Sequence, residues 1–208
     1  MNRSEDAASD SGLIGRIHAF WFGDAGGDMP TGARNELWFR GGPELDHALR
    51  ARFGDAVERA LSGAFDHWRQ SAAGSLAFVL LLDQFTRNIF RGSPRAYEGD
   101  ERALSAARLA LARGFDLSLQ PIERVFLYLP FEHAENLAEQ DRSVELFGQL
   151  VRAAGPARRN ELQGFLRHAR EHREIVRRFG RFPHRNAVLG RDSTADELAF
   201  LEQPGSSF

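Results

Sequence analysis

The sequence predicts an all-α fold, because its apolar residues recur at helical spacing and no useful length of chain alternates with the period of a strand. Leu45, Leu49, Phe53, Val57 and Leu61 fall every four residues, so they share one face of a helix. Glycines and prolines separate such segments and mark their ends. We therefore expect a bundle of about eight helices joined mostly by short connections.

The elements follow in chain order from these signals. Residues 1–11 are polar and acidic and are expected to form a disordered tail, which leaves 12–208 as a single helical domain. Residues 23–32 hold glycines and a proline but no phosphate-loop pattern, so a plain linker is expected there. Helices are predicted over residues 13–22, 43–63, 75–91, 95–113, 143–151 and 156–179. Another helix is predicted to start at Pro121 and to kink at Pro130, and a short one follows Ser193 or Thr194.

Composition excludes several classes of function. The 208 residues are 42% hydrophobic and carry a net charge of −2, so no basic field favours nucleic acid or an anionic membrane. The longest apolar run, residues 76–82, is too short to cross a bilayer, and no signal peptide is recognisable, so a cytoplasmic location is expected. Cysteine is absent and all 27 basic residues are arginine, which excludes thiol nucleophiles, Schiff bases and a phosphate-loop lysine. The sequence carries no signal for an oligomeric state.

The stretch from Asp83 to Arg91 is the first candidate site. It follows a run that is apolar all round, which is typical of a buried helix. At about 100° per residue, Asp83, Gln84, Arg87, Asn88 and Arg91 fall within an arc of roughly 140°. Buried arginines there would offer planar donors to a carboxylate or phosphate, with Asp83 as a base or an orienting group. The alternative is a surface ion pair between residues four apart.

A second candidate group surrounds Pro130, which should kink its helix. Glu132 and His133 follow the proline directly, and His172 lies on the apolar stripe of the helix over 156–179. These side chains could act as acids and bases near neutral pH, or they could repair the kink and satisfy the core. His168 and His172 are four residues apart, the spacing at which two histidines of one helix can bind the same metal ion. His168 lies off the apolar face that carries His172, so we predict neither a metal nor a cofactor.

Donors in residues 181–186 form the third group. Arg181, His184, Arg185 and Asn186 surround a Phe-Pro pair and could complete an anion pocket with Arg87 and Arg91. The alternative is a capping loop that ties down helix carbonyl groups.

Several strings resemble the bacterial family catalogued as domain of unknown function 924. They are FWFGD at 20–24, LWF at 37–39, LLLDQFTRNIFRGSPRAY at 80–97, ERVFLYLPFEHAE at 123–135, QDRSVELF at 140–147 and RFGRFPHRNAVLGR at 178–191. The resemblance covers nearly the whole chain and implies a tetratricopeptide-like fold without implying an activity. Thr86 stands where the family pattern usually has proline, and Trp38, from the second string, joins the ligand-binding candidates.

Three functions remain open. The first is a helical protein whose internal pocket binds a small anion, a phosphate or a carboxylate, with catalysis as an extension of that role. The second is a hydrolase that works without cysteine or lysine, using Asp83 or Glu132 with His133, His172 or His184 as acid and base. The third is a protein-interaction scaffold that reads an acidic peptide, which rests on fold analogy.

Overall fold

The computed structural model of the chain describes residues 3–23, 38 and 41–206, and within these ranges it is helical and holds no strand. The all-α prediction is therefore confirmed. The α-helices are α1 Arg3–Phe22, α3 Pro43–Leu61, α4 Ala72–Val79, α5 Thr86–Ile89, α6 Asp100–Ala112, α7 Pro121–His133, α8 Leu137–Ala153, α9 Pro156–Phe179 and α10 Ala195–Leu201. A π-helical segment, η2 Leu80–Phe85, joins α4 to α5. The 3-10 turns are η1 Asp66–Gln70, η3 Pro94–Tyr97, η4 Phe115–Ser118 and η5 Pro183–Arg185.

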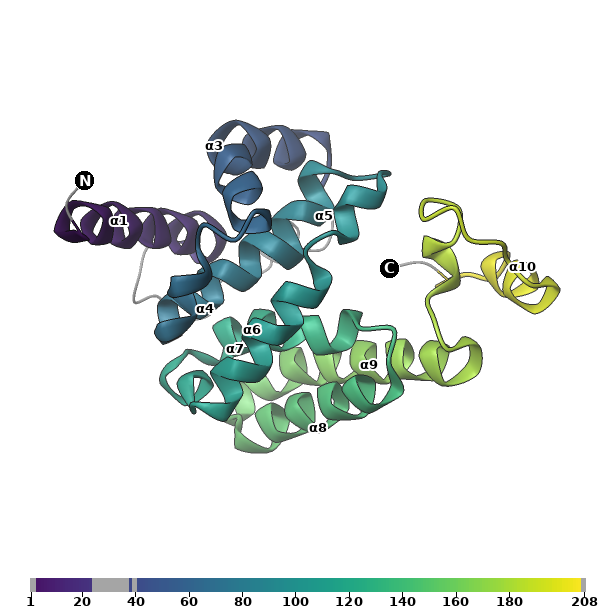
Figure 1. Cartoon of the computed structure of the whole chain (residues 1–208). Helices are drawn as coiled ribbons and strands as arrows, with labels where there is room; N and C mark the ends of the chain where they lie inside the picture. The colour runs from purple at the N-terminus through teal and green to yellow at the C-terminus, as the bar shows by residue number, and fades with distance from the viewer. Residues whose placement is uncertain (1–2, 24–37, 39–40, 207–208) are drawn as a thin grey trace.

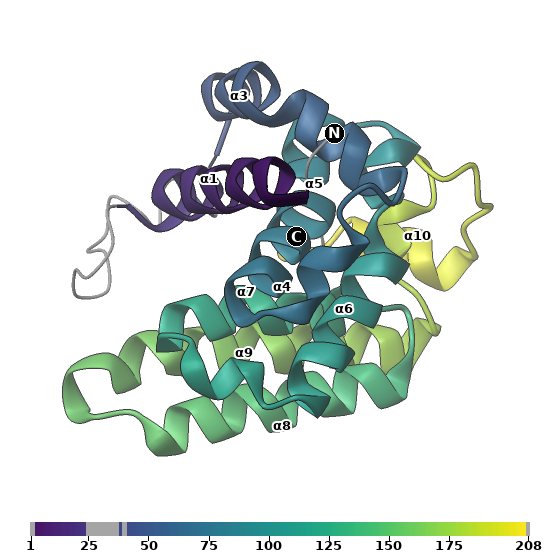
Figure 2. The same cartoon turned by 60° about the vertical axis from the view of Figure 1, so that its left-hand side comes forward.

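Helices α8 and α9 run side by side as an antiparallel hairpin along one edge of the molecule (Figures 1 and 2). Helix α7 packs on α8, and α6 packs on both α4 and α7. The chain after α9 turns back as η5 and α10, which lie at the same side of the molecule as the C-terminal end of α9 (Figure 1). This arrangement brings the end of α7, the middle of α9 and η5 toward η2.

Aromatic side chains dominate the main core. The indole of Trp21 lies 5.3 Å from the ring of Phe85 and 5.5 Å from that of Phe126, while Trp38 lies 4.9 Å from Phe126. Trp38 also donates its Nε1 hydrogen to the carbonyl of Trp21 at 2.9 Å. Each such ring pair contributes about 0.5–1.5 kcal/mol beyond the area that it buries. Trp38 is thus packed in the core, and its role in ligand binding stays a prediction.

The predicted helix boundaries hold where proline or a capping box marks them. Pro121 begins α7, and Glu123 accepts a hydrogen bond from the backbone of Gln120 at 2.8 Å. Thr194 is the N-cap of α10 and forms the corresponding capping box with Glu197. Gly180 ends α9 in the left-handed conformation, with φ of 71°, as expected of a glycine at a helix C-terminus.

Three expectations differ from the structure. Residues 3–11, expected as a disordered tail, belong to α1, in which the alanines and acids of this stretch favour a helix. The helix expected over 75–91 widens into a π-helix at η2 and ends at Ile89. The helix expected from Arg95 begins at Asp100 instead, after the separate turn η3. The linker expected at 23–32 lies outside the described residues from position 24 onward.

Helix α7 passes through Pro130 without interruption and ends at His133. Glu132 and His133 are therefore in its last turn rather than beyond a break. The buried amide of Gln140 from α8 closes this end of α7 by donating to the carbonyl groups of Glu132 and Ala134 at 2.5 and 2.8 Å. Among the helices of the described ranges, none combines the length and apolar character that a bilayer span requires.

Candidate functional site

Asp83 lies at the centre of a group of buried and half-buried polar side chains. The apolar run from Leu80 to Leu82 is buried on all sides and carries Asp83 with it, so that its side chain is 0% exposed. Gln84 donates from Nε2 to Oδ2 of Asp83 at 2.6 Å, and Nδ1 of His133 lies 2.7 Å from Oδ1. We call the full group the polar cluster. Its members are Asp83, Arg87, Asp100, Glu132, His133, His172, His184 and Arg185.

Asp83 and His133 form a hydrogen-bonded acid–base pair. Burial would raise the pKa of Asp83, but the charge of Arg87, together with the charge and hydrogen bond of His133, holds that pKa below its ordinary value. An ionised Asp83 only accepts hydrogen bonds, so the proton of His133 sits on Nδ1. Burial lowers the pKa of His133 and the charge of Asp83 opposes this, with a net lowering. In the neutral ring the lone pair is therefore on Nε2.

Arg87 joins η2 to the start of α6. Its two terminal nitrogens donate to the two carboxylate oxygens of Asp100 at 2.7 and 3.0 Å, and Nη1 also reaches the carbonyl of Asp83 at 2.9 Å. Burial lowers the pKa of Arg87, but Asp83 and Asp100 raise it above its ordinary value. Arg87 is thus a charged group whose two terminal nitrogens already donate to the protein.

Gly99 allows this contact to form. It precedes α6 and lies so close to η2 that a Cβ atom at this position would be 2.3 Å from the carbonyl oxygen of Leu82. The absence of a side chain lets the N-terminus of α6 approach the π-helix, and Asp100 follows immediately in the sequence.

Arg185 is buried, with 6% exposure, and its guanidinium is only partly used by the protein. Its Cζ lies 4.4 Å from the ring centre of Phe182 and 4.8 Å from that of Tyr97. Its sole hydrogen bond within the described residues runs from Nη1 to Oδ2 of Asp100 at 3.4 Å, and its buried Nε has no partner there. Burial and the charge of Arg87 lower the pKa of Arg185 to about 10.

Other arginines of the chain show what Arg185 lacks. Arg91, Arg177 and Arg181 each donate from Nε and Nη2 to the two oxygens of one carboxylate. This side-on edge is the planar donor pair that matches a carboxylate or a phosphate. In Arg185 the same edge faces no protein acceptor among the described residues.

Glu132 and His172 form the deeper part of the polar cluster. Nδ1 of His172 lies 2.9 Å from the carbonyl oxygen of His168 and 3.4 Å from Oε1 of Glu132. The other carboxyl oxygen of Glu132, Oε2, is buried without a hydrogen-bond partner in the described part of the chain. Burial, followed by the charge of Asp83, raises the pKa of Glu132 to about 8, and burial lowers the pKa of His172 to about 3. Both groups are thus neutral at pH 7.

The chain after α9 covers the polar cluster through Phe182, His184 and Arg185. Phe182 is fully buried, and its ring lies 5.5 Å from that of His172 and 5.7 Å from that of His184. Burial and the charge of Arg185 lower the pKa of His184 to about 4. Glu135 holds this segment in place by accepting the backbone N–H of Phe182 at 2.7 Å and two donors of Arg191 at 2.5 and 2.8 Å.

The predicted residues Arg91 and Asn88 lie outside the polar cluster. The side chain of Arg91 is 58% exposed and pairs with Asp46 of α3, and Asn88 donates to the carbonyl of Gln84 at 2.8 Å and accepts from Arg91. The predicted arc fails here because a π-helix has more residues per turn than an α-helix, so the regular rotation is lost before Arg91.

Arg181 and Asn186 also have structural partners instead of facing the polar cluster. Arg181 binds both carboxylate oxygens of Glu197 in α10, at 2.7 and 2.8 Å. Asn186 donates to Ser193 at 3.0 Å and accepts from Arg191 at 3.0 Å. For these two residues, the capping-loop alternative describes the contacts better than the anion-pocket prediction does.

Sequence reasoning missed Asp100 and Tyr97. Asp100 is the carboxylate shared by Arg87 and Arg185, and the ring of Tyr97 lies 5.5 Å from Cζ of Arg87 and 4.8 Å from that of Arg185. Tyr97 stands inside one of the family-like strings, which was the available signal. Asp100 looks like an ordinary acidic residue in the first turn of a helix, so nothing distinguished it. No three His, Asp or Glu residues of the described ranges are placed to hold a metal ion together.

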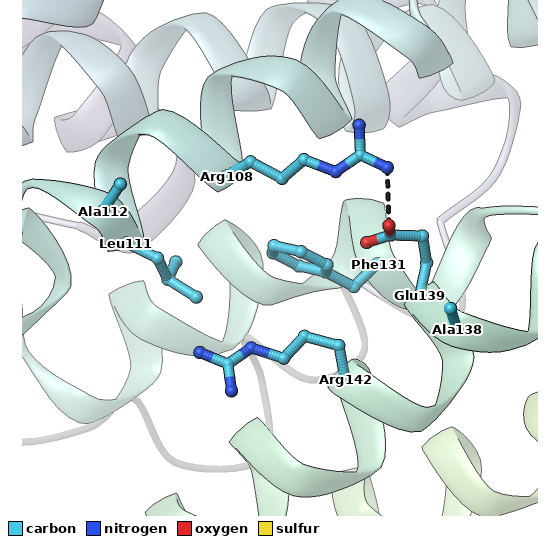
Figure 3. Close-up of a pocket in the computed structure, with 7 residues that line it drawn as sticks. All are labelled: Arg108, Leu111, Ala112, Phe131, Ala138, Glu139 and Arg142. Atoms are coloured by element: carbon cyan, nitrogen blue, oxygen red, sulfur yellow. Dashed lines mark hydrogen bonds and ion pairs between the residues drawn. The ribbon is translucent and has the colours of Figure 1, made fainter.

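A separate pocket of about 380 Å³ opens between α6, α7 and α8. Figure 3 shows the ring of Phe131 in it, between the side chains of Arg108 and Arg142, with Arg108 paired to Glu139 at 2.5 Å. Leu111, Ala112 and Ala138 complete its lining. No member of the polar cluster lines this pocket, so the two features are distinct.

Comparison with known proteins gives a family and a fold. The model of a family described as bacterial protein of unknown function (DUF924) matches residues 17–205. A solved structure, that of the protein of unknown function ATU0120 from Agrobacterium tumefaciens, is 40% identical and superposes with a TM-score of 0.78. The match covers 92% of this chain and 98% of that one. No curated protein matches.

Proposed function

This chain belongs to the bacterial family of unknown function DUF924, and we propose from its own residues that the polar cluster binds a small anion, a carboxylate or a phosphate. The observation that carries the proposal is the unused side-on edge of Arg185. A buried N–H without a partner costs about 1–3 kcal/mol, so a partner from outside the chain would stabilise the fold. Groups that offer two neighbouring oxygen acceptors, such as a carboxylate or a phosphate, fit this edge best.

The charges around Arg185 support the same proposal. Arg87 and Asp100 satisfy each other through two hydrogen bonds, and Asp83 is held by His133 and Gln84. Arg185 shares Asp100 with Arg87 and donates to that carboxylate only at 3.4 Å. The positive charge of Arg185 is therefore the least compensated in the polar cluster, and burial makes an opposite charge favourable there.

The burial of Arg185 also limits the size of the ligand. Only 6% of the residue is exposed, and the rings of Phe182 and Tyr97 lie against its guanidinium. A single carboxylate or phosphate group, on a small molecule, is the class of ligand that we propose.

Thermal unfolding in the presence of anions tests this proposal. We expect phosphate, sulfate or a small carboxylate to stabilise the protein by about 2.7 kcal/mol at a hundredfold excess over its dissociation constant. For a domain of this size that is a rise in melting temperature of roughly 5–10 °C. Arg185→Gln should remove the response, because it removes the charge and the guanidinium edge.

Arg91→Gln is the matched control, because it deletes one arginine charge at an exposed ion pair away from the polar cluster. It should keep the wild-type response to the anion. If no anion shifts the wild type, or if folded Arg185→Gln responds as the wild type does, Arg185 binds only water and the proposal is wrong.

A second candidate is hydrolysis by acid–base catalysis, which the 2.7 Å contact between Asp83 and His133 favours. In this mechanism Nε2 of His133 takes a proton from a water molecule as its oxygen attacks an ester of the bound acid. Glu132, neutral near pH 7, would donate a proton to the leaving oxygen. The proton that His133 took from water would then pass to Glu132 and restore both groups.

Asp83→Asn tests that mechanism, because the amide cannot hold His133 in the same tautomer and charge state. With a panel of phosphate and carboxylate esters, we expect wild-type turnover to fall by at least about a hundredfold in the variant. Turnover that is undetectable in the wild type across the panel, or unchanged in Asp83→Asn, argues for binding alone. The scaffold alternative has less support, since Arg91 and Arg181 are already occupied by Asp46 and Glu197.

A further inference from the structure

The polar cluster is close to electrically neutral before any ligand binds. Its charged members are the carboxylates of Asp83 and Asp100 and the guanidiniums of Arg87 and Arg185, while Glu132 and His172 are neutral at pH 7. An anion that binds at Arg185 compensates that guanidinium, but it leaves the buried cluster as a whole with one excess negative charge. Such a charge is costly unless another group changes its charge at the same time.

Histidines are the groups that can do so, and the structure distinguishes among them. His133 directs Nδ1 to the carboxylate of Asp83 at 2.7 Å, so a proton added at Nε2 gives an imidazolium that is already paired with an anion. His172 instead contacts a backbone carbonyl and the neutral Glu132. His184 belongs to the covering segment, where its ring lies 5.7 Å from that of Phe182. The geometry thus favours His133 as the proton acceptor.

The surroundings of His133 explain why it is neutral without a ligand. The charged and titratable groups that face or influence it come from η2, α5, α6, α7, α9 and η5. They are Asp83, Arg87, Asp100, Glu132, His172, His184 and Arg185. Burial, Arg87 and Arg185 disfavour its protonated form, and Asp83 favours it. An anion on Arg185 would offset one of the two opposing cations.

We propose that the polar cluster binds its anion together with one proton, which is taken up by Nε2 of His133. This inference rests on the proposed function, because it requires an anion at Arg185. It adds a regulatory consequence, since a site that takes up a proton with its ligand binds more tightly as the pH falls. The balance is simple: one anion and one solvent proton enter, and the net charge of the polar cluster is unchanged.

The sign of the pH effect follows from linkage. The pKa of His133 is below its ordinary value in the free protein and should be higher when the anion is bound. Between these two pKa values the bound state holds more protons than the free state. The association constant should therefore fall as the pH rises through that window, by up to tenfold per pH unit.

Isothermal titration calorimetry of the full chain measures this proton directly. Sulfate and acetate are suitable probes, because neither changes its charge between about pH 6 and pH 8. Titrations near pH 6.5 in two buffers of different ionisation enthalpy give the number of protons taken up. We expect between about 0.5 and 1 proton per anion for the wild type, and less than about 0.2 for His133→Gln. His67→Gln, at an exposed histidine of η1, is the matched control and should retain the wild-type value.

Each outcome decides a different point. If an anion binds with no proton uptake and a pH-independent affinity, the anion enters alone and this inference is wrong, while the proposed function stands. If proton uptake persists in His133→Gln, the assignment to His133 is wrong. If neither probe binds, both proposals fail. Should His133→Gln not fold, NMR titration of the histidine ring protons in the wild type decides, since the His133 pKa must rise when the anion is added.

Discussion

Glu132 and Asp83 are both buried carboxyl groups, yet their surroundings drive their pKa values in opposite directions. Asp83 has Arg87, His133 and Gln84 within hydrogen-bonding or ion-pair distance, and these contacts outweigh its burial. Glu132 has a weak contact with His172 and one oxygen without a partner, so burial prevails and its pKa rises to about 8. Of these two carboxyl groups, Asp83 is therefore ionised and Glu132 is neutral at pH 7.

The raised pKa of Glu132 predicts a pH dependence of stability. Between its unfolded value near 4.5 and its folded value of about 8, the folded state holds a proton that the unfolded state releases. The free energy of unfolding should therefore fall with rising pH in this window, by up to about 1.4 kcal/mol per pH unit from this group. Glu132→Gln, which keeps the shape without titrating, should flatten that slope and be the more stable protein at pH 8.

Urea unfolding from pH 5 to pH 8 measures the slope. Glu101→Gln is the matched control, because Glu101 is exposed at the start of α6, and it should leave the slope of the wild type unchanged. If the free energy of unfolding depends on pH in the same way in the wild type and in Glu132→Gln, Glu132 is ionised in the folded protein and the prediction is wrong.

Single residues of the polar cluster were predictable where a local pattern marked them. Asp83 and Arg87 follow an apolar run, and Glu132 and His133 follow an interior proline, so both pairs could be selected from the sequence. Their meeting with His172 and Arg185 could not be, because it depends on how α7, α9 and η5 pack. Asp100 shows the same limit, since its role comes from a contact made across thirteen positions of the chain.

At the scale of elements, the approach of α6 to η2 positions Asp100 against Arg87. The start of α6 at Asp100 was not predictable from periodicity, because Arg95, Ala96 and Glu98 before it also favour a helix. The π-helix was not predictable either, since Leu80, Leu81 and Leu82 are apolar all round and show no change of period. Helix ends marked by proline, glycine or a capping box were predicted correctly, because those signals are local.

Gly99 gives a prediction for this contact. Gly99→Ala would place Cβ 2.3 Å from the carbonyl oxygen of Leu82, so α6 and η2 must separate. We expect a loss of about 1–3 kcal/mol in the free energy of unfolding, as is usual for overpacking.

Gly164→Ala provides the contrast in the middle of α9. A Cβ there meets nothing nearer than 3.9 Å, so the substitution should stabilise the protein by up to about 1 kcal/mol through helix propensity. Denaturant unfolding of both variants gives the comparison. If Gly99→Ala is as stable as Gly164→Ala, the close approach at Leu82 does not constrain the fold.

On the scale of the whole molecule, the segment after α9 turns back as η5 and α10 (Figure 1). It covers the polar cluster through Phe182, whose ring lies 5.5 Å from that of His172, and through Arg185, which donates to Asp100. Its attachment differs from that of the helical body. Phe182 belongs to a small apolar group with Ile175 and Val176, separate from the main core. Polar contacts supply the rest of the attachment, with Glu135 binding Arg191 and the backbone of Phe182. A segment held in this way can open locally while α8 and α9 remain folded.

Glu135→Gln should therefore loosen the covering segment selectively. The glutamine amide lacks the negative charge of the carboxylate that binds both terminal nitrogens of Arg191. Because a hydrogen bond to a charged group contributes about 1.5–3 kcal/mol, the attachment of the segment should weaken by a similar amount. Hydrogen exchange over residues 182–201 should accelerate by about tenfold or more, whereas exchange in the α8–α9 hairpin should not change. Glu174→Gln, which breaks an exposed pair with Arg177 on α9, should leave both regions as in the wild type. Equal acceleration of the hairpin in Glu135→Gln would mean that the segment and the body unfold together, and the polar cluster would then be accessible only through global unfolding.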